Sequence, residues 1–233
     1  MTEKAKRLIK ERYTFEDMVE LMTLLRSEDG CPWDREQTHE SIRKNFIEET
    51  YEAVEAIDNN DTANLREELG DVMLQVLFHA EMEKEAGNFD INDVITEVCT
   101  KLVVRHPHIF GDVTAETADK VLDNWEEIKI KTKGQSNPKN RLEDVPKSLP
   151  ALMRAYKVVK RAEKAGTDLG SLEENIADTE KLIAGIHGTS KAEMEEIMGN
   201  LLIKFVIMAK KCEIEPEEAL TKATNRYIIE YEG

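Results

Sequence analysis

The sequence predicts an all-α protein built from two similar helical halves, and three observations support this fold class. Apolar residues recur with the 3.6-residue period of a helix along most of the 233 residues, and few stretches alternate as a strand would. Turn-forming segments such as DNND at 58–61 separate the helical patterns. The stretch from Gly70 to Phe78 also has a counterpart of similar pattern from Gly199 to Ile207, which indicates an internal repeat.

The elements of the first half follow from start and stop signals along the chain. Thr14 with Asp17 three residues later is typical of a helix N-terminus, and Gly87 is typical of the residue just after a helix. In chain order we expect a short or frayed helix in the basic segment 1–13, a helix from Thr14 to Arg26, a loop with an aromatic residue at 27–39, helices at about 39–58 and 61–86, a helix from Asp90 or Asn92 to Arg105, a structured loop at RHPHIFGD, and a last helix around Trp125.

Two acidic clusters lie within the two central helices of this half. Residues three apart share a helix face, so Glu49 pairs with Glu52 and Glu68 pairs with Asp71. The DNND turn would pack the two helices antiparallel and bring the pairs face to face. Four carboxylates at short range repel one another unless a cation compensates, and Mg²⁺ takes carboxylate oxygens together with waters and phosphates. The sequence therefore indicates a magnesium site.

A solvated acidic face is the alternative, since 34% of the residues are charged. The apolar neighbours favour the metal site. Ile47, Tyr51 and Val54 follow helical spacing beside the first cluster, and the segment VMLQVLF after Asp71 is apolar nearly all round. We therefore expect the second helix to be buried on several sides, and carboxylates at the edge of a buried helix need partners.

Basic and aromatic residues further along the chain offer contacts for a phosphorylated ligand. Lys101 and Arg105 are four residues apart on one helix and could reach a phosphate, although salt bridges to the acidic helices are an equal alternative. Trp125 and Lys129 share a face and could stack a base and touch a phosphate. Packing of the tryptophan on a bundle, with the lysine at its rim, is the alternative for that pair.

Composition narrows the class of protein. The net charge of −16 argues against a general nucleic-acid binder, which would need a basic surface. The three cysteines are far apart with no CxxC, which predicts a reducing cytoplasm and no zinc site. The N-terminus lacks the apolar core of a signal peptide, and no apolar run approaches the roughly 20 residues of a membrane span.

A polar segment, KGQSNPKNR at 133–141, separates the halves. We predict a first domain at 1–133, a linker at 134–146 and a second domain at 147–233. The second domain has lost the acids, because Asn200 stands at the position of Asp71 and Ile197 at that of Glu68. No clear ExxE lies at the right offset in SLEENIADTEKLIAG. The second half is therefore interpreted as a degenerate copy kept for packing.

The combined motifs resemble a known family. EETYE, fifteen residues and ELGD form the pattern ExxE…ExxD, with GCPWDREQTH before it and RHPHIFGD after it. This combination resembles the MazG family of nucleoside triphosphate pyrophosphohydrolases, in the all-α NTP pyrophosphatase superfamily. The resemblance is strong over residues 14–133 and weaker over the second half, including KSLPALMRAYKVVKRA.

The resemblance implies an activity, a cofactor and an assembly. Such enzymes cleave NTPs and dNTPs between the α and β phosphates to the monophosphate and pyrophosphate, clear the nucleotide pool, need Mg²⁺ (often replaceable by Mn²⁺), and work as dimers of helical bundles. By this resemblance, Glu49, Glu52, Glu68 and Asp71 match the metal ligands, and Glu48 matches a residue that orients or deprotonates the attacking water. Lys101 and Arg105 match basic residues near the triphosphate, and Trp125 and Lys129 match a pair that closes on the nucleotide.

Other functions remain open at this point. A relative selective for dUTP or for a phosphoribosyl-nucleotide fits the same motifs, as does a non-catalytic helical regulatory protein. A di-iron carboxylate bundle is excluded because it needs Glu-x-x-His pairs, and none stands at the acidic clusters. In two-domain relatives either copy can carry the activity. Here the second copy lacks the acids, so activity is expected in the first.

Overall fold

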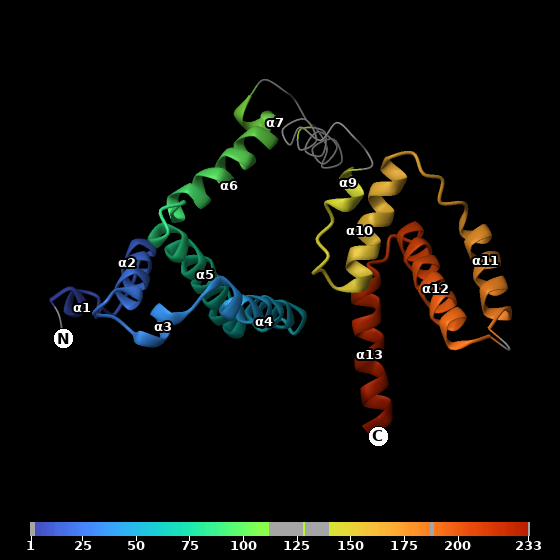
Figure 1. The fold of residues 1–233 in the computed structure, drawn as a ribbon, viewed down its shortest axis with the longest axis horizontal. Coiled ribbons are helices and arrows are strands. Elements are labelled where there is room, and N and C mark those ends of the chain that lie inside the picture. The colour runs from blue at the N-terminus through green and yellow to red at the C-terminus, as the bar shows by residue number, and fades with distance from the viewer. Residues whose placement is uncertain (1–2, 112–127, 129–139, 187–188, 233) are drawn as a thin grey trace. The chain divides into compact units, whose positions relative to one another are not determined.

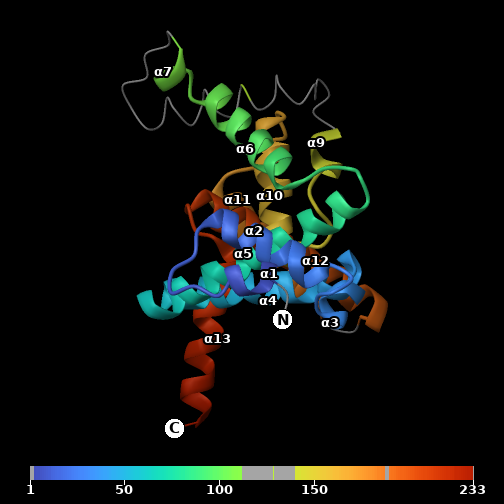
Figure 2. The same ribbon diagram turned by 90° about the vertical axis from the view of Figure 1, so that its left-hand side faces the viewer.

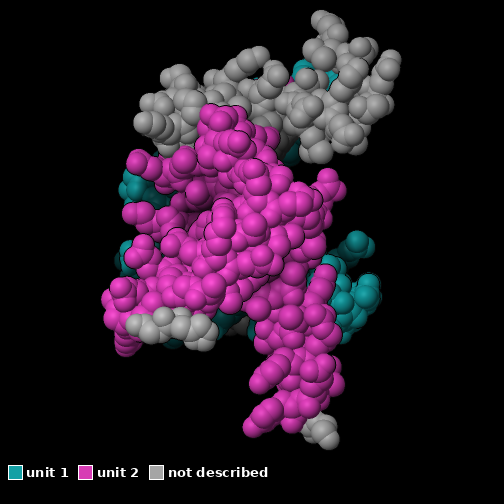
Figure 3. Space-filling view, turned by 90° about the vertical axis from the view of Figure 1, so that its right-hand side faces the viewer, with its two compact units in different colours: residues 1–122 teal, residues 123–233 magenta. Residues whose placement is uncertain are grey.

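The computed structural model describes residues 3–111, 128, 140–186 and 189–232, and these form helices and their connections without any strand. The predicted all-α class is therefore confirmed. The chain divides into two compact units, residues 1–122 (unit 1) and 123–233 (unit 2), which Figure 3 shows in different colours. The domain and linker boundaries at 133 and 147 stay predictions. Within the described residues, none of the helices combines the length and apolar character that a membrane span requires.

Unit 1 is organised around an antiparallel pair of long helices. Its elements are α1 (Glu3–Arg7), α2 (Phe15–Arg26), α3 (Pro32–Glu36), α4 (His39–Asp58), α5 (Thr62–Glu85), α6 (Ile91–Arg105) and α7 (Pro107–Phe110). The expected positions of α2, α4, α5 and α6 are confirmed. The segment 27–39, expected to be a loop, contains the short helix α3, because Pro32 at its first position favours a helical start.

Local hydrogen bonds explain where these helices begin and end. Thr14 and Asp17 form a reciprocal capping box at the start of α2. In the turn between α4 and α5, Asn60 takes a left-handed conformation (φ 53°), and the Asp61 side chain accepts hydrogen bonds from the backbone of Ala63 and Asn64. The predicted DNND turn is thus a helix stop followed at once by a helix start, and it folds α5 back along α4.

The core of unit 1 lies where α2 packs against the C-terminal half of α5 (Figures 1 and 2). The buried side chains there include Met22, Ile42, Leu77 and Phe78. Arg26 and Glu81 are charged residues that are also buried. The Arg26 guanidinium donates to both Glu85 oxygens (2.8 and 2.7 Å) and to two backbone carbonyls, and lies 5.5 Å from the centre of the Phe78 ring. It ties the ends of α2 and α5 together.

Unit 2 repeats the helical hairpin. Its described elements are α9 (Asn140–Glu143), α10 (Ala151–Lys164), α11 (Leu172–Ala184), α12 (Lys191–Lys211) and α13 (Pro216–Glu232). Helices α10 and α11 both pack on α12, around buried Val159, Val206 and Ile207. Helix α13 contacts α10 and α12, and its C-terminal part extends beyond the rest of the unit (Figures 1 and 3).

We expect Arg26→Met to lower the free energy of unfolding by about 2–3 kcal/mol, because the Glu85 carboxylate and two carbonyls lose a charged donor in a buried position. Urea unfolding monitored by circular dichroism measures the change. Arg7→Met is the matched control: Arg7 also pairs with a glutamate, Glu20, but is exposed, so its replacement should change stability by about 0.5 kcal/mol or less. Equal effects of the two substitutions would contradict this account.

Candidate metal centre

The α4–α5 hairpin brings three of the predicted carboxylates together. Glu49 of α4 and Glu68 and Asp71 of α5 each place one carboxylate oxygen within 4.8 Å of the other two. All three side chains are half-buried. Glu68 and Asp71 meet because they are three residues apart on one helix, and Glu49 faces them because the DNND turn sets the register of the two helices.

The other two predicted acids on α4 take different positions. Glu52 is exposed, yet its charge and a hydrogen bond with its carboxyl group act on both Glu49 and Glu68, so it lies at the edge of the cluster. Glu48 is exposed and pairs with Lys44, one turn earlier on α4, at 2.7 Å.

The electrostatics of the cluster show an excess of negative charge. Partial burial, and then the charges of Asp71 and Glu52, raise the pKa of Glu49 above its ordinary value. Partial burial, followed by the charges of Glu52 and Asp71, raises the pKa of Glu68 in the same way. Within the described residues, no ion pair joins a lysine or an arginine to Glu49, Glu68 or Asp71.

This donor set fits a hard divalent cation. Carboxylate oxygens from two facing helices are the ligands that Mg²⁺ and Mn²⁺ prefer, and a cation between them would remove the repulsion that raises the two pKa values. Oxygen-only donors do not favour zinc, which binds thiolate and imidazole groups more strongly. The residues present can therefore hold the ion that the sequence predicted.

Lys101 and Arg105, the predicted phosphate contacts, lie on α6 and not on the α4–α5 hairpin that carries the carboxylates. Lys101 lies on α6 and pairs with Glu97 of the same helix at 3.1 Å, while Arg105 is in the last turn of that helix. Figure 1 shows α6 leaving the C-terminal end of α5 and running away from the α4–α5 turn. Trp125 and Lys129 lie outside the described residues.

The apolar residues beside the cluster are exposed in the single chain, whereas the segment after Asp71 is buried at Leu77 and Phe78, as expected. On α4, Ile47, Tyr51 and Val54 expose 46, 53 and 45% of their surface. On α5, Leu69 and Met73 expose 53 and 44%. The spacing of these residues places each set on one face of its helix. None of the described residues of unit 1 covers this apolar face, so these side chains stay exposed.

Two polar features of α5 were not found from the sequence. Gln75, one turn after Asp71, is buried, and its Oε1 atom has no hydrogen-bond partner. One turn further, the His79 ring stacks on His39 of α4, and His39 also contacts Glu83 at 2.6 Å. The His39–His79 contact joins residues forty positions apart, so helical spacing gave no signal for it. By contrast, the i, i+4 spacing between Asp71 and Gln75 can be read from the sequence.

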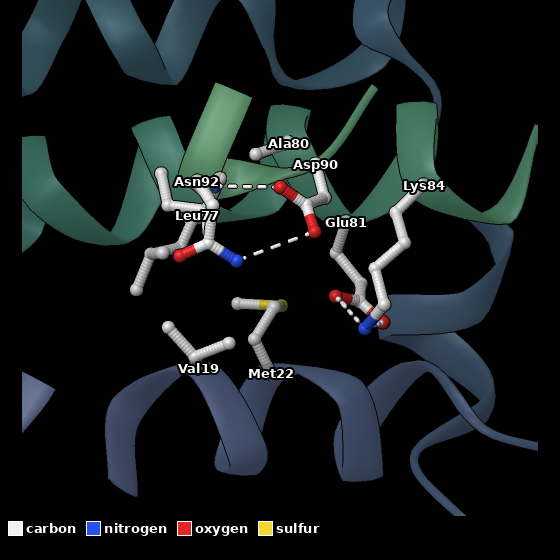
Figure 4. A pocket seen from close by; sticks show the side chains of 9 residues that line it. Val19, Met22, Leu77, Ala80, Glu81, Lys84, Asp90 and Asn92 are labelled. Carbon is white, nitrogen blue, oxygen red and sulfur yellow. Dashed lines mark hydrogen bonds and ion pairs between the residues drawn. The ribbon is translucent and has the colours of Figure 1, made fainter. Parts of the chain in front are cut away.

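A separate cavity of 230 Å³ lies between α2, α5 and the start of α6 (Figure 4). Val19 and Met22 approach it from α2, and Glu81 and Lys84 from α5. Its polar groups already have partners: Glu81 pairs with Lys84, and Asp90 caps α6. We therefore assign this cavity to packing and not to the site.

The matches to known proteins cover the same residues. The family model described as MazG nucleotide pyrophosphohydrolase domain matches residues 37–110, which include both acidic clusters. The chain is 41% identical over 217 residues to the nucleoside triphosphate pyrophosphohydrolase of Escherichia coli K12, with 90% of this chain and 82% of the relative covered. It is 39% identical over 215 residues to the nucleoside triphosphate pyrophosphohydrolase/pyrophosphatase MazG of Thermotoga maritima, covering 92% and 82%.

We expect the double replacement Glu49→Gln and Glu68→Gln to stabilise the metal-free protein at pH 7. A carboxyl whose pKa is raised by folding binds its proton more readily in the folded state, so its contribution to stability falls as pH rises above the ordinary value of 4.5. The advantage of the double variant should therefore shrink as the pH is lowered toward 4.5. Urea unfolding in EDTA at several pH values measures this difference.

Replacement of Glu55, an exposed residue of α4 outside the cluster, by Gln is the control and should give no such pH-dependent difference. A double variant that is less stable than the wild type at pH 7 in EDTA would show that the cluster is not under repulsion.

Proposed function

The chain belongs to the MazG family of nucleoside triphosphate pyrophosphohydrolases, which are hydrolases acting on acid anhydrides, and on this basis we propose a reaction for unit 1. Unit 1 cleaves NTPs and dNTPs between the α and β phosphates. The products are the nucleoside monophosphate and pyrophosphate. The observation that carries this proposal is the meeting of Glu49, Glu68 and Asp71 within 4.8 Å across two helices. Removal of aberrant nucleotides from the pool is the role that we infer for such an activity.

The proposed cofactor is Mg²⁺, with Mn²⁺ as a substitute. Glu49, Glu68 and Asp71 would hold it, and Glu52 at the edge of the cluster is the proposed fourth ligand. When bound, a divalent cation neutralises the triphosphate and lowers the pKa of a coordinated water. The family membership and the donor set support this assignment.

The chain's own residues would position the reactants and accept a proton. Attack of water on the α-phosphorus forms one P–O bond as the bond to the β-phosphate oxygen breaks, and the proton of the water passes to a carboxylate. Glu48 is the proposed acceptor, since it is adjacent to Glu49 in sequence and exposed; its ion pair with Lys44 would have to open. Lys101 and Arg105, with Trp125 and Lys129, remain the proposed nucleotide contacts.

A homodimer is the proposed assembly. Exposed apolar faces on α4 and α5 flank the carboxylates, and α6 adds exposed Ile95, Val98 and Leu102 at helical spacing. A second copy packed there would bury these side chains. It would also allow α6 of the partner to approach the carboxylates of this chain, from which this chain's α6 runs away. A cytoplasmic location is proposed as well, in keeping with Cys31, Cys99 and Cys212, which are free thiols.

Glu52→Gln and Asp71→Asn are each expected to reduce hydrolysis by at least ~100-fold, because each removes a charge that the cation requires. The assay follows monophosphate and pyrophosphate release with Mg²⁺, and circular dichroism checks that the helices persist. Asn200→Ala, at the position in unit 2 that matches Asp71, is the control and should leave turnover almost unchanged. Full activity in either acidic variant would reject the metal assignment.

Ile47→Glu is expected to convert the dimer into a monomer, because it places a charge within the exposed apolar face of α4. Light scattering should change from twice the chain mass of 26.6 kDa to that mass. Ile9→Glu is the matched control, since Ile9 is 68% exposed and outside this face. A wild type that is monomeric at assay concentrations, or an Ile47→Glu variant that stays dimeric, would contradict the proposed interface.

A further inference from the structure

The two helical hairpins can be compared residue by residue through their buried positions. Aligning Gly70 with Gly199 places the adjacent buried pair Leu77 and Phe78 of α5 on Val206 and Ile207 of α12, which are also buried. With the same offset, Gln75 of α5 corresponds to Lys204 of α12. Gln75 lies one helical turn after Asp71, and Lys204 lies one turn after Asn200, which matches Asp71. Each residue is therefore on the same helix face as the Asp71 position of its unit.

The facing helices correspond as well. Glu49 and Glu52 of α4 match Asn175 and Asp178 of α11, which keep the spacing of three. Ala53 and Thr179, four residues after the first member of each pair, are both 7% exposed. This alignment was not visible as an ExxE pattern, because one glutamate has become asparagine and the other aspartate.

Lys204 reaches both members of this pair in unit 2. Its Nζ atom donates to the Asn175 Oδ1 atom at 3.2 Å and to the Asp178 Oδ2 atom at 2.9 Å. Asn175 is 1% exposed and is held in place, because its Nδ2 atom donates to the backbone oxygens of Leu169 and Ser171. The ammonium group therefore lies against the residues that match two of the carboxylates proposed to hold the cation in unit 1.

The charges at the corresponding positions support an exchange of one cation for another. Unit 1 has four carboxylates at positions 49, 52, 68 and 71. Unit 2 keeps one, Asp178, since the other three positions hold Asn175, Ile197 and Asn200. The hydrogen bond from Lys204, and then that from Lys181, lowers the pKa of Asp178, as expected of a carboxylate paired with cations. One lysine can neutralise one carboxylate but not four.

We propose that the Lys204 ammonium group takes, in unit 2, the place of the divalent cation of unit 1, so that unit 2 is a self-neutralised hairpin that needs no metal. This inference rests on the metal site of the proposed function. It makes position 75 the one that decides whether the hairpin of unit 1 is open to a metal ion. Gln75 is neutral and buried, and its Oε1 atom accepts no hydrogen bond, so a lysine at this position would break none there.

The test transfers the lysine to unit 1 as Gln75→Lys, with Gln75→Met as the matched control of similar length and no charge. Binding of Mn²⁺ alone, measured by titration calorimetry, is expected to be at least ~10-fold weaker for Gln75→Lys than for Gln75→Met. Thermal unfolding in EDTA should occur at a higher temperature for Gln75→Lys than for Gln75→Met, because the lysine relieves the repulsion of the carboxylates. Equal Mn²⁺ affinity of the two variants would overturn the proposal.

The reciprocal variant tests unit 2. Lys204→Met removes one of the two lysines that pair with Asp178, the one that also contacts Asn175, and should lower the unfolding temperature. Lys204→Arg should retain most of the wild-type stability, because the arginine keeps the charge. Neither variant should change Mn²⁺ binding or hydrolysis. A Lys204→Met variant as stable as the wild type would overturn the proposal.

Failure of this inference can be told from failure of the proposed function. A wild type that neither binds Mn²⁺ nor hydrolyses nucleotides rejects both. A wild type that does bind Mn²⁺, together with a Gln75→Lys variant that binds it equally well, rejects only the role of the lysine.

Discussion

The candidate site of unit 1 depends on a repulsion between carboxylates that no described side chain of the unit relieves. Glu49, Glu68 and Asp71 converge because α4 and α5 are held antiparallel, and that arrangement is fixed elsewhere, by the Asn60–Asp61 turn and by the buried side chains toward the C-terminal end of α5. The raised pKa values of Glu49 and Glu68 show the electrostatic consequence. Folding thus sets up a cluster that the proposed cation would stabilise, and the oxygens of a triphosphate could share that cation.

The helices could be predicted from the sequence because their signals are local. Thr14, Asp61 and Gly87 stop or start helices through hydrogen bonds or backbone conformations within a few residues, and the spacing of the acids fixes which share a face. Features that depend on tertiary packing could not be predicted. The exposure of Ile47 and Tyr51 depends on what covers α4, and the position of Lys101 relative to the carboxylates depends on the direction in which α6 leaves α5.

The two units show how one helical hairpin can meet the same electrostatic demand in two ways. Unit 1 keeps four carboxylates and a neutral Gln75, and unit 2 keeps one carboxylate and Lys204. Loss of the acids in unit 2 was evident from Ile197 and Asn200, but the compensating lysine was not, because Lys204 and Asp178 are far apart in the chain and only the α11–α12 contact joins them. Erosion of a metal site therefore need not weaken the hairpin that carried it.

The central claim is that unit 1 directs water to the α-phosphorus of a nucleoside triphosphate with the help of a divalent cation. The most direct measurement is hydrolysis of each NTP and dNTP in ¹⁸O-labelled water, with Mg²⁺ or with EDTA, followed by mass analysis of the products. The account predicts monophosphate and pyrophosphate only with metal, with the label in the monophosphate. Label in the pyrophosphate, release of inorganic phosphate, or no turnover with either Mg²⁺ or Mn²⁺ would contradict it.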